Sequence, residues 1–239
     1  MKSITSQIPN IITLLNLFSG CVASIYAFQG DFLWAGLFVC LGVFFDFFDG
    51  LMARLLNVSS ELGLQLDSLA DLVTSGFVPG LVVFQLLGQN LNPDFSLRNF
   101  DFASSDSIAL IGFLVSLASA YRLANFNIDT EQREDFIGLP TPGNALLIIG
   151  SAITIQEVKT PYAVELLIAL TLLSSYLLNA KLRLFSFKFK NFSFNKNWYR
   201  FLMILISVIA LILFQIKAIP LIIISYIMLS IWVFSRSKS

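Results

Sequence analysis

Long apolar stretches, separated by short polar turns, follow one another along the whole chain. Eight of them approach the length of about 17–25 residues that a helix needs to cross a bilayer. Gly30-Asp31, the polar stretch 89–105 and Pro161 are the turn signals between them. The pattern predicts an all-α, polytopic helical bundle with about eight transmembrane helices, within a range of about six to eight. The expected spans are 10–28, 32–56, 63–88, 106–126, 142–157, 163–180, 198–215 and 218–235.

The composition supports an integral membrane protein. Hydrophobic residues make up 56% of the 239 residues and charged residues 13%, whereas soluble globular chains are about 45–50% apolar and about 25% charged. No repeat or soluble domain interrupts the pattern, so one domain over 1–239 is expected, with its core at about 8–180 and a basic segment and the last two helices in 181–239. The first apolar run lacks a small-residue cleavage site and is expected to be a retained helix. Cys21 and Cys40 have no metal-ligand spacing and are expected to be buried small apolar residues.

Lys and Arg are distributed unevenly between the two ends of the expected helices. With the N-terminus in the cytoplasm, twelve of the fifteen basic residues fall on the inside and three on the outside. This asymmetry follows the positive-inside rule. We therefore expect both termini inside, in a bacterial cytoplasmic (inner) membrane. The inside set is Lys2, Arg54, Arg122, Arg133, Lys181, Arg183, Lys188, Lys190, Lys196, Arg200, Arg236 and Lys238; the outside set is Arg98, Lys159 and Lys217.

The stretch 181–200 carries six basic residues, no acidic residue and several interleaved aromatic residues. Apolar spans flank it closely, which favours contact with anionic lipid headgroups over nucleic acid. Simple control of topology explains the same residues equally well. No nucleic-acid partner is expected.

Four aspartates, Asp46, Asp49, Asp67 and Asp71, lie in segments that are otherwise apolar enough for membrane helices. A charged carboxylate at bilayer depth costs at least ~2.5–3.5 kcal/mol on insertion scales. Four together therefore need a strong compensating positive charge. Arg54, the one basic residue nearby, is too little to neutralise them.

The spacing of these residues is helical. Asp46, Asp49, Gly50 and Ala53 share one stripe of a helix, and Gly63, Asp67 and Asp71 share another. A short polar link joins the two helices, so they are expected to be antiparallel neighbours whose acidic stripes converge near the cytoplasmic surface. Several hard oxygen ligands suit Mg²⁺ or Mn²⁺.

The residues next to the aspartates also indicate a ligand. Gly50 and Gly63 each cost a helix ~1 kcal/mol relative to alanine. Their missing side chains let a nucleotide approach the helix backbone, although close helix packing explains them too. The chain has no histidine, which excludes Ser-His and Cys-His catalysis. Asp71, the deepest acid from the loop, is the candidate general base for an attacking hydroxyl.

Residues 46–71 read D-x2-D-G-x2-A-R-x8-G-x3-D-x3-D, which resembles the signature of the CDP-alcohol phosphotransferase (phosphatidyltransferase) family. The resemblance implies a helical membrane fold in which an alcohol attacks the lipid-side phosphorus of a CDP-linked donor and CMP leaves. It implies a homodimer, and a two-metal site held by all four aspartates with Asp71 as the base. The residues that it assigns to the CDP group are Gly50, Ala53, Arg54 and Gly63.

Further segments resemble the phosphatidylserine synthase branch of that family. They are IPNIITLLNLFSG at 8–20, DSLADLVTSGFVPG at 67–80, YRLANFNI at 121–128 and FIGLPTPGNA at 136–145. Departures from the branch pattern occur at Thr74, Ser75, Val78 and Asn125. The likeness implies CDP-diacylglycerol as donor and L-serine as acceptor.

Individual residues in these segments have alternative interpretations. Arg122 and Arg133 are candidates for holding the serine carboxylate, or they contribute only to sidedness and headgroup contact. Asn10, Thr13 and Asn16 can bind the donor, or they can bond neighbouring helices.

Three other functions fit parts of the pattern. A related transferase using glycerol 3-phosphate or inositol phosphate needs more cations than 122–141 offers, where two arginines face four acids. An intramembrane prenyltransferase has its two aspartate motifs far apart, whereas here both lie within 46–71. A cation or proton transporter explains buried carboxylates, but not the glycine and arginine spacing.

Overall fold

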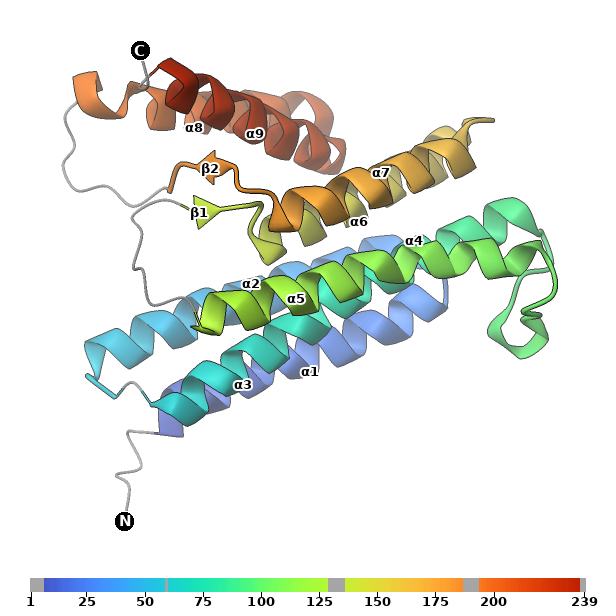
Figure 1. The fold of residues 1–239 in the computed structure, drawn as a ribbon, viewed down its shortest axis with the longest axis horizontal. Coiled ribbons are helices and arrows are strands. Elements are labelled where there is room, and N and C mark those ends of the chain that lie inside the picture. The colour runs from blue at the N-terminus through green and yellow to red at the C-terminus, as the bar shows by residue number, and fades with distance from the viewer. Residues whose placement is uncertain (1–6, 59, 129–135, 187–193, 237–239) are drawn as a thin grey trace.

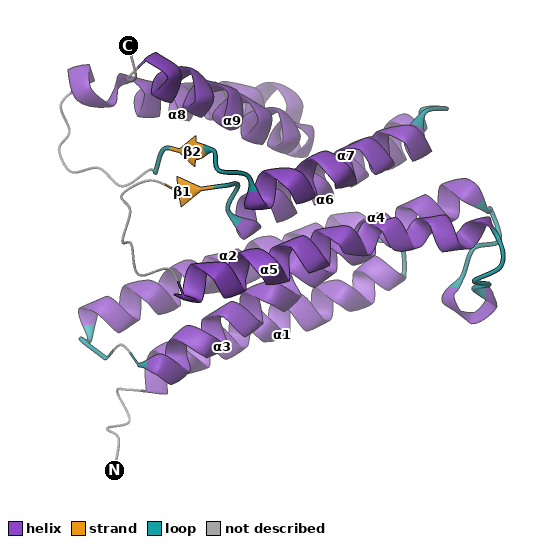
Figure 2. Ribbon diagram, viewed as in Figure 1, coloured by secondary structure: helices purple, strands orange, loops and turns teal. Residues whose placement is uncertain are grey.

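The structure is a computed structural model that describes residues 7–58, 60–128, 136–186 and 194–236. Within these residues the chain is almost entirely helical, and two short strands pair antiparallel with Phe136 opposite Leu184 (Figure 2). The helical elements are α1 (Ile8–Phe28), α2 (Phe32–Leu55), α3 (Glu61–Asp71), η2 (Leu72–Phe77), α4 (Val78–Leu91), η3 (Leu97–Asn99), η4 (Ser105–Phe113), α5 (Leu114–Ile128), α6 (Thr141–Val158), α7 (Ala163–Asn179), α8 (Phe194–Phe214), η5 (Gln215–Lys217) and α9 (Ala218–Arg236); the strands are β1 (Phe136–Ile137) and β2 (Arg183–Leu184).

The predicted fold class is confirmed. Each expected span coincides with one helix or one continuous run of helices, to within a few residues. Five helical stretches are long and apolar enough to cross a membrane, and Ala163–Asn179 is a shorter apolar helix. The exact number of spans remains a prediction. The five stretches are Ile8–Phe28, Phe32–Leu55, Glu61–Leu91, Ser105–Ile128 and Asn197–Ser235, the last of which contains both α8 and α9.

Helices α1 to α7 run back and forth along one common direction, and α8 and α9 lie beside them at an angle (Figure 1). Helices α1, α2 and α4 to α7 share one apolar core, and a second core lies between the beginning of α6, β2, α8 and α9. Helix α1 begins and α9 ends toward the same end of the bundle, where α2 also ends and α3 begins (Figure 1). The side of the membrane that this end faces remains a prediction.

Local capping explains where α2 and α3 begin, at opposite ends of the bundle. Asp31 accepts a hydrogen bond from the Trp34 N–H at 3.2 Å and caps α2, and Gly30 before it has φ +77°. Ser60 accepts from the Gly63 N–H at 3.0 Å and caps α3. The cap fixes the helical register that orients Asp67 and Asp71.

Thr74 fits tightly between α1 and α2. A methyl group on Gly42 would come within 2.5 Å of Thr74 Cγ2. A methyl group on Gly20 would likewise clash with Thr74. Thr74 Oγ1 also donates to the Asn16 carbonyl at 3.1 Å. Because only glycine allows this approach, the two glycines fix how deep η2, and Asp71 just before it, lie between the first two helices.

Two features differ from a bundle of regular α-helices. The segment η2 after Asp71 is a π-helix, a form found mainly at functional sites, and η4 is a 3₁₀-helix. Both lie inside spans that were expected to be uniform helix, because hydropathy does not distinguish one helical hydrogen-bond pattern from another.

The expectation that Cys21 and Cys40 are buried is wrong, since both are exposed on the outside of the bundle. Large apolar side chains such as Phe18, 65% exposed, and Leu117, 66% exposed, share this outer surface. In a bilayer the outer surface meets lipid and is as apolar as the interior. Hydrophobicity alone therefore does not predict burial in this chain.

Candidate functional site

Three aspartates converge where α2 ends and α3 begins. One carboxylate oxygen from each of Asp46, Asp49 and Asp67 lies within 4.8 Å of the corresponding oxygens of the other two. Asp49 is buried and the other two are half-buried. The i, i+3 spacing on α2 places its two acids on one face, and the Ser60 cap turns α3 so that Asp67 faces them.

Asp71 lies one turn deeper on α3 than Asp67. Its side chain is 9% exposed, and Asn16 Nδ2 donates to its Oδ1 at 3.2 Å. It is close enough to Asp46 and Asp67 for direct electrostatic interaction, but it is not part of the group of three converging oxygens. The fourth acid therefore borders the cluster on its inner side.

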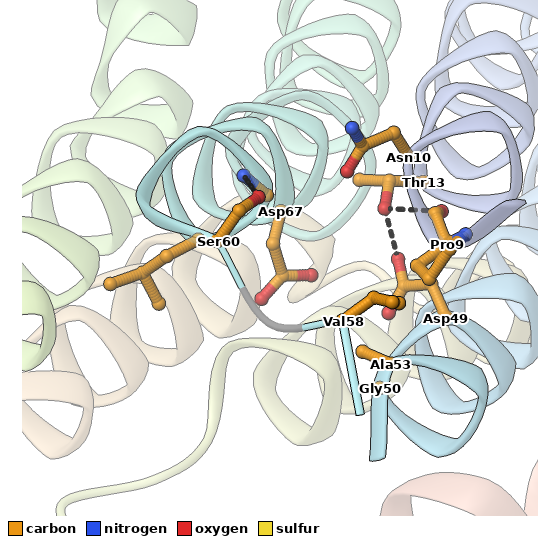
Figure 3. A pocket seen from close by; sticks show the side chains of 11 residues that line it. Pro9, Asn10, Thr13, Asp49, Gly50, Ala53, Val58, Ser60 and Asp67 are labelled. Carbon is orange, nitrogen blue, oxygen red and sulfur yellow. Dashed lines mark hydrogen bonds between the residues drawn. The ribbon is translucent and has the colours of Figure 1, made fainter. Parts of the chain in front are cut away.

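Helix α1, whose Asn10, Thr13 and Asn16 are expected either to bind the donor or to bond neighbouring helices, completes the site with hydrogen bonds to α2 and α3. Those two helices touch near their link, but each packs mainly on α1. Thr13 Oγ1 donates to Asp49 Oδ2 at 2.5 Å and also lies 3.0 Å from the Pro9 carbonyl (Figure 3). Thr13 and Asn16 thus each hold one carboxylate, and Asn10 donates to Gln7 Oε1 at 3.2 Å.

A pocket of about 180 Å³ opens beside the carboxylates. Figure 3 shows the Asp49 and Asp67 side chains on facing sides of it. Of the residues expected to bind the CDP group, Arg54 is absent from the lining; it is exposed near the end of α2, one residue after Ala53. The lining consists of Pro9, Asn10, Thr13, Asp49, Gly50, Ala53, Val58, Ser60, Gly63, Leu64 and Asp67.

The two glycines of the motif differ in their surroundings. In the described part of the chain, nothing lies within 4 Å of where a Gly50 Cβ would be, so close helix packing there does not explain this residue. A Cβ on Gly63 would be 3.2 Å from Ser60 Oγ and 3.3 Å from Asn10 Oδ1. Gly50 thus leaves open space in the pocket, whereas Gly63 also serves the contact between α3 and α1.

Gly50→Ala is expected to preserve or increase thermal stability, because alanine favours a helix by up to about 1 kcal/mol. The added methyl group would occupy space that a ligand needs, so the KM for a CDP-linked donor should rise. Gly42→Ala is the matched control, since its methyl group would meet Thr74 and should lower the unfolding temperature. An unchanged donor KM in Gly50→Ala would show that the open space has no role in binding the donor.

The donor set fits a divalent cation. All candidate ligands are hard carboxylate oxygens. Asp67 Oδ1 is buried without a hydrogen-bond partner. Among the residues that the structure describes, no Lys or Arg forms an ion pair with any of the four aspartates. Carboxylates this close repel one another strongly unless a cation lies between them.

The arginines proposed for serine are in different situations. Arg122 on α5 is partly buried; its Nη2 lies 3.5 Å from the Ile137 carbonyl, its Nε has no partner in the described chain, and it interacts electrostatically with Asp71. Arg133 lies outside the described residues. Of the basic stretch, Arg183 lies over the Phe234 ring at 4.7 Å, and Arg200 Nε donates to the Ser186 carbonyl at 2.8 Å.

One supporting contact was not foreseen. Ser68 Oγ donates to Asn127 Oδ1 at 3.1 Å and ties α3 to α5 beside the site. The sequence indicated only that both are polar residues within apolar spans. A single sequence does not show which polar residues contact one another.

Comparison with known proteins now gives the class. The family model described as CDP-alcohol phosphatidyltransferase matches residues 6–235. The chain belongs to this family, and it is an integral membrane protein.

Similar curated proteins include several called CDP-diacylglycerol–serine O-phosphatidyltransferase. The one from Helicobacter pylori (strain J99) is 34% identical over 143 residues, which cover 59% of this chain and 55% of that protein. The one from Bacillus subtilis (strain 168) is 34% identical over 146 residues, 60% of this chain and 75% of that protein. The one from Saccharomyces cerevisiae is 33% identical over 162 residues, which cover 61% of this chain and 53% of that protein. The match thus spans little more than half of the Helicobacter and yeast proteins.

Proposed function

We propose that this chain transfers a phosphatidyl group from CDP-diacylglycerol to L-serine and releases CMP, as a CDP-diacylglycerol–serine O-phosphatidyltransferase. The observation that carries the proposal is the convergence of three carboxylates from α2 and α3 beside a pocket lined by the family's glycine and alanine positions. Several relatives bear this enzyme's name. The whole chain is proposed to act as one catalytic domain.

Asp46, Asp49 and Asp67 would hold the divalent cations, Mg²⁺ or Mn²⁺, and Asp71 would contribute from the inner side. Two ions per site are proposed. When bound, they neutralise the diphosphate and stabilise the phosphoryl group in transfer. Thr13 and Asn16 would orient Asp49 and Asp71 through their hydrogen bonds, as outer partners of metal ligands commonly do.

The pocket would take the CDP end of the donor. Gly50 and Ala53, which have small or no side chains, leave space beside the α2 backbone. Asn10, Thr13 and Gly63 line the pocket opposite them. Arg54, exposed one residue beyond the lining, would reach the nucleotide or its phosphates from the rim.

Asp71 would act as the general base. The serine hydroxyl gives its proton to the Asp71 carboxylate while its oxygen forms a bond to the lipid-side phosphorus. The bond from that phosphorus to the CMP oxygen breaks, and CMP leaves with the bonding electron pair. Asn16 would hold the Asp71 carboxylate in position for this transfer.

Arg122 would hold the serine carboxylate. It is partly buried on α5, its Nε has no partner among the described groups, and it interacts electrostatically with Asp71. A guanidinium in this situation suits a carboxylate ligand. Arg133 is proposed for headgroup contact or sidedness.

The membrane setting completes the proposal. The twelve-to-three distribution of basic residues supports an active site that faces the cytoplasm, with both termini inside and the stretch 181–200 on anionic headgroups. The proposed membrane is the bacterial inner membrane, and the proposed assembly is a homodimer.

The test is acceptor-dependent CMP release by the purified protein in lipid nanodiscs. With CDP-diacylglycerol, Mn²⁺ and labelled L-serine, we expect CMP and a labelled lipid in equal amounts. Glycerol 3-phosphate and inositol phosphate should give neither. Preferential use of one of these phosphates would reject serine as the acceptor, and CMP release without any alcohol would reject the transfer reaction.

A further inference from the structure

Asn144 in the first turn of α6 is fully buried, and neither end of its amide has a partner. Its exposed fraction is 0%, and neither Nδ2 nor Oδ1 forms a hydrogen bond within the described chain. Buried side-chain amides are nearly always hydrogen-bonded in proteins. An amide with one free donor end and one free acceptor end in a membrane protein's interior indicates a polar ligand.

Other unpartnered polar atoms are on the elements around Asp71. Ser75 Oγ is on η2, four residues after Asp71, and Ser119 Oγ and Arg122 Nε are on α5. Elements η2, α5 and α6 pack on one another. Ser119 lies directly against η2, because a methyl group on Gly76 would come within 3.0 Å of its Cβ. Ser75, Ser119 and Arg122 therefore lie on the two elements next to Asp71, η2 and α5, and α6 with Asn144 packs on both elements.

The beginning of α6 favours an anion at the same place. No side chain caps this 18-residue helix, and its N-terminal N–H groups and dipole attract negative charge. Arg122 Nη2 lies 3.5 Å from the carbonyl of Ile137, four residues before Thr141, where the helix begins. The guanidinium and the helix terminus are thus brought to the same side of α5 by the short segment between them.

We propose that Asn144 is a specificity-determining contact for the zwitterionic head of the acceptor, together with Arg122. An α-amino acid carries a carboxylate and an ammonium on one carbon, so Asn144 Nδ2 would donate to the former and Oδ1 would accept from the latter. The α6 terminus and Arg122 supply further donors for the carboxylate. This inference rests on the proposed function, which supplies an amino acid as the acceptor.

The test is the KM for L-serine of Asn144→Leu, which keeps the number and branching of the side-chain heavy atoms and removes both polar ends. We expect an increase of about tenfold or more, the value of hydrogen bonds to charged groups, with the KM for CDP-diacylglycerol unchanged. The unfolding temperature should not fall, because the variant removes buried groups that have no partner. Preference for L-serine over ethanolamine, which lacks the carboxylate, should also fall, by the smaller factor that corresponds to the Nδ2 contact alone.

Gln85→Leu is the matched control, because Gln85 is another buried amide with an unpartnered Oε1. It lies 14 residues beyond Asp71 along the same helical run, which is about 21 Å of helix. It should leave the serine KM and the serine preference unchanged.

An increase of less than about tenfold in the serine KM of Asn144→Leu would overturn the proposal. The same holds if both Asn144→Leu and the smaller Asn144→Ser fail to fold while Gln85→Leu folds, since the amide is then structural. A wild-type protein that releases CMP with another alcohol but not with serine would instead refute the proposed function, and this inference with it.

Discussion

Asp71→Asn is expected to lower kcat about 10²–10⁴-fold, the usual contribution of a positioned general base. Asparagine has almost the same shape and can still accept from Asn16, but it cannot take the proton of the attacking hydroxyl. Because Asp71 lies beside the three converging carboxylates and not among them, Mn²⁺ affinity should fall much less than turnover. Single-turnover CMP release and Mn²⁺ binding, measured on the same preparation, give the two values.

Asp106→Asn is the control for this substitution. Asp106 is also a buried acid, 3% exposed, and accepts from Asn92 Nδ2 at 3.2 Å. It belongs to η4, in the connection between α4 and α5, and this connection lies at the opposite end of the bundle (Figure 1). Its replacement should leave kcat unchanged. Near-normal turnover in Asp71→Asn together with weakened metal binding would make Asp71 a ligand and not the base.

Asp46→Ala is expected to reduce CMP release at least about 10³-fold, since a catalytic metal contributes several kcal/mol to transition-state stabilisation. The variant removes one of the three converging carboxylates and a neighbour of both Asp67 and Asp71. Removing a repelling acid from an apolar span should at the same time raise the unfolding temperature in EDTA. We therefore expect the rate of CMP release to fall while the unfolding temperature in EDTA rises.

Chelation provides the complementary experiment to Asp46→Ala. EDTA should abolish CMP release by the wild type, and added Mg²⁺ or Mn²⁺ should restore it. In Asp46→Ala, excess metal should restore little activity. Full wild-type activity in EDTA would contradict a metal-dependent mechanism.

Much of the fold could be predicted because the bilayer imposes strong limits on helix length. Spans near 20 residues and turn signals such as Gly30-Asp31 located α1 and α2 to within a few residues. Within the π-helix after Asp71, Thr74 fits between Gly20 and Gly42, and hydropathy shows neither the helix type nor this tertiary contact. The exposure of Cys21 and Cys40 could not be predicted either, because lipid-facing and core positions have the same composition.

Helical spacing predicted the part of the candidate site that lies within single helices. The regular spacing within α2 and within α3 placed Asp46, Asp49 and Asp67 correctly on facing stripes. It did not show that Thr13 and Asn16 of α1 hold two of the carboxylates, because such contacts join residues 36 and 55 positions apart. The role of Arg54 remains a prediction, since its exposed side chain lies outside the pocket lining.

Anomalous diffraction at the manganese edge, from crystals grown with Mn²⁺ and CDP, tests the central claim most directly. That claim is that clustered acids persist in this apolar bundle because divalent cations join them to a diphosphate. We predict anomalous peaks about 2.0–2.2 Å from carboxylate oxygens of Asp46, Asp49 and Asp67, with the diphosphate on the pocket side. Aspartates turned toward separate surfaces, with no anomalous peak between them, would contradict the account.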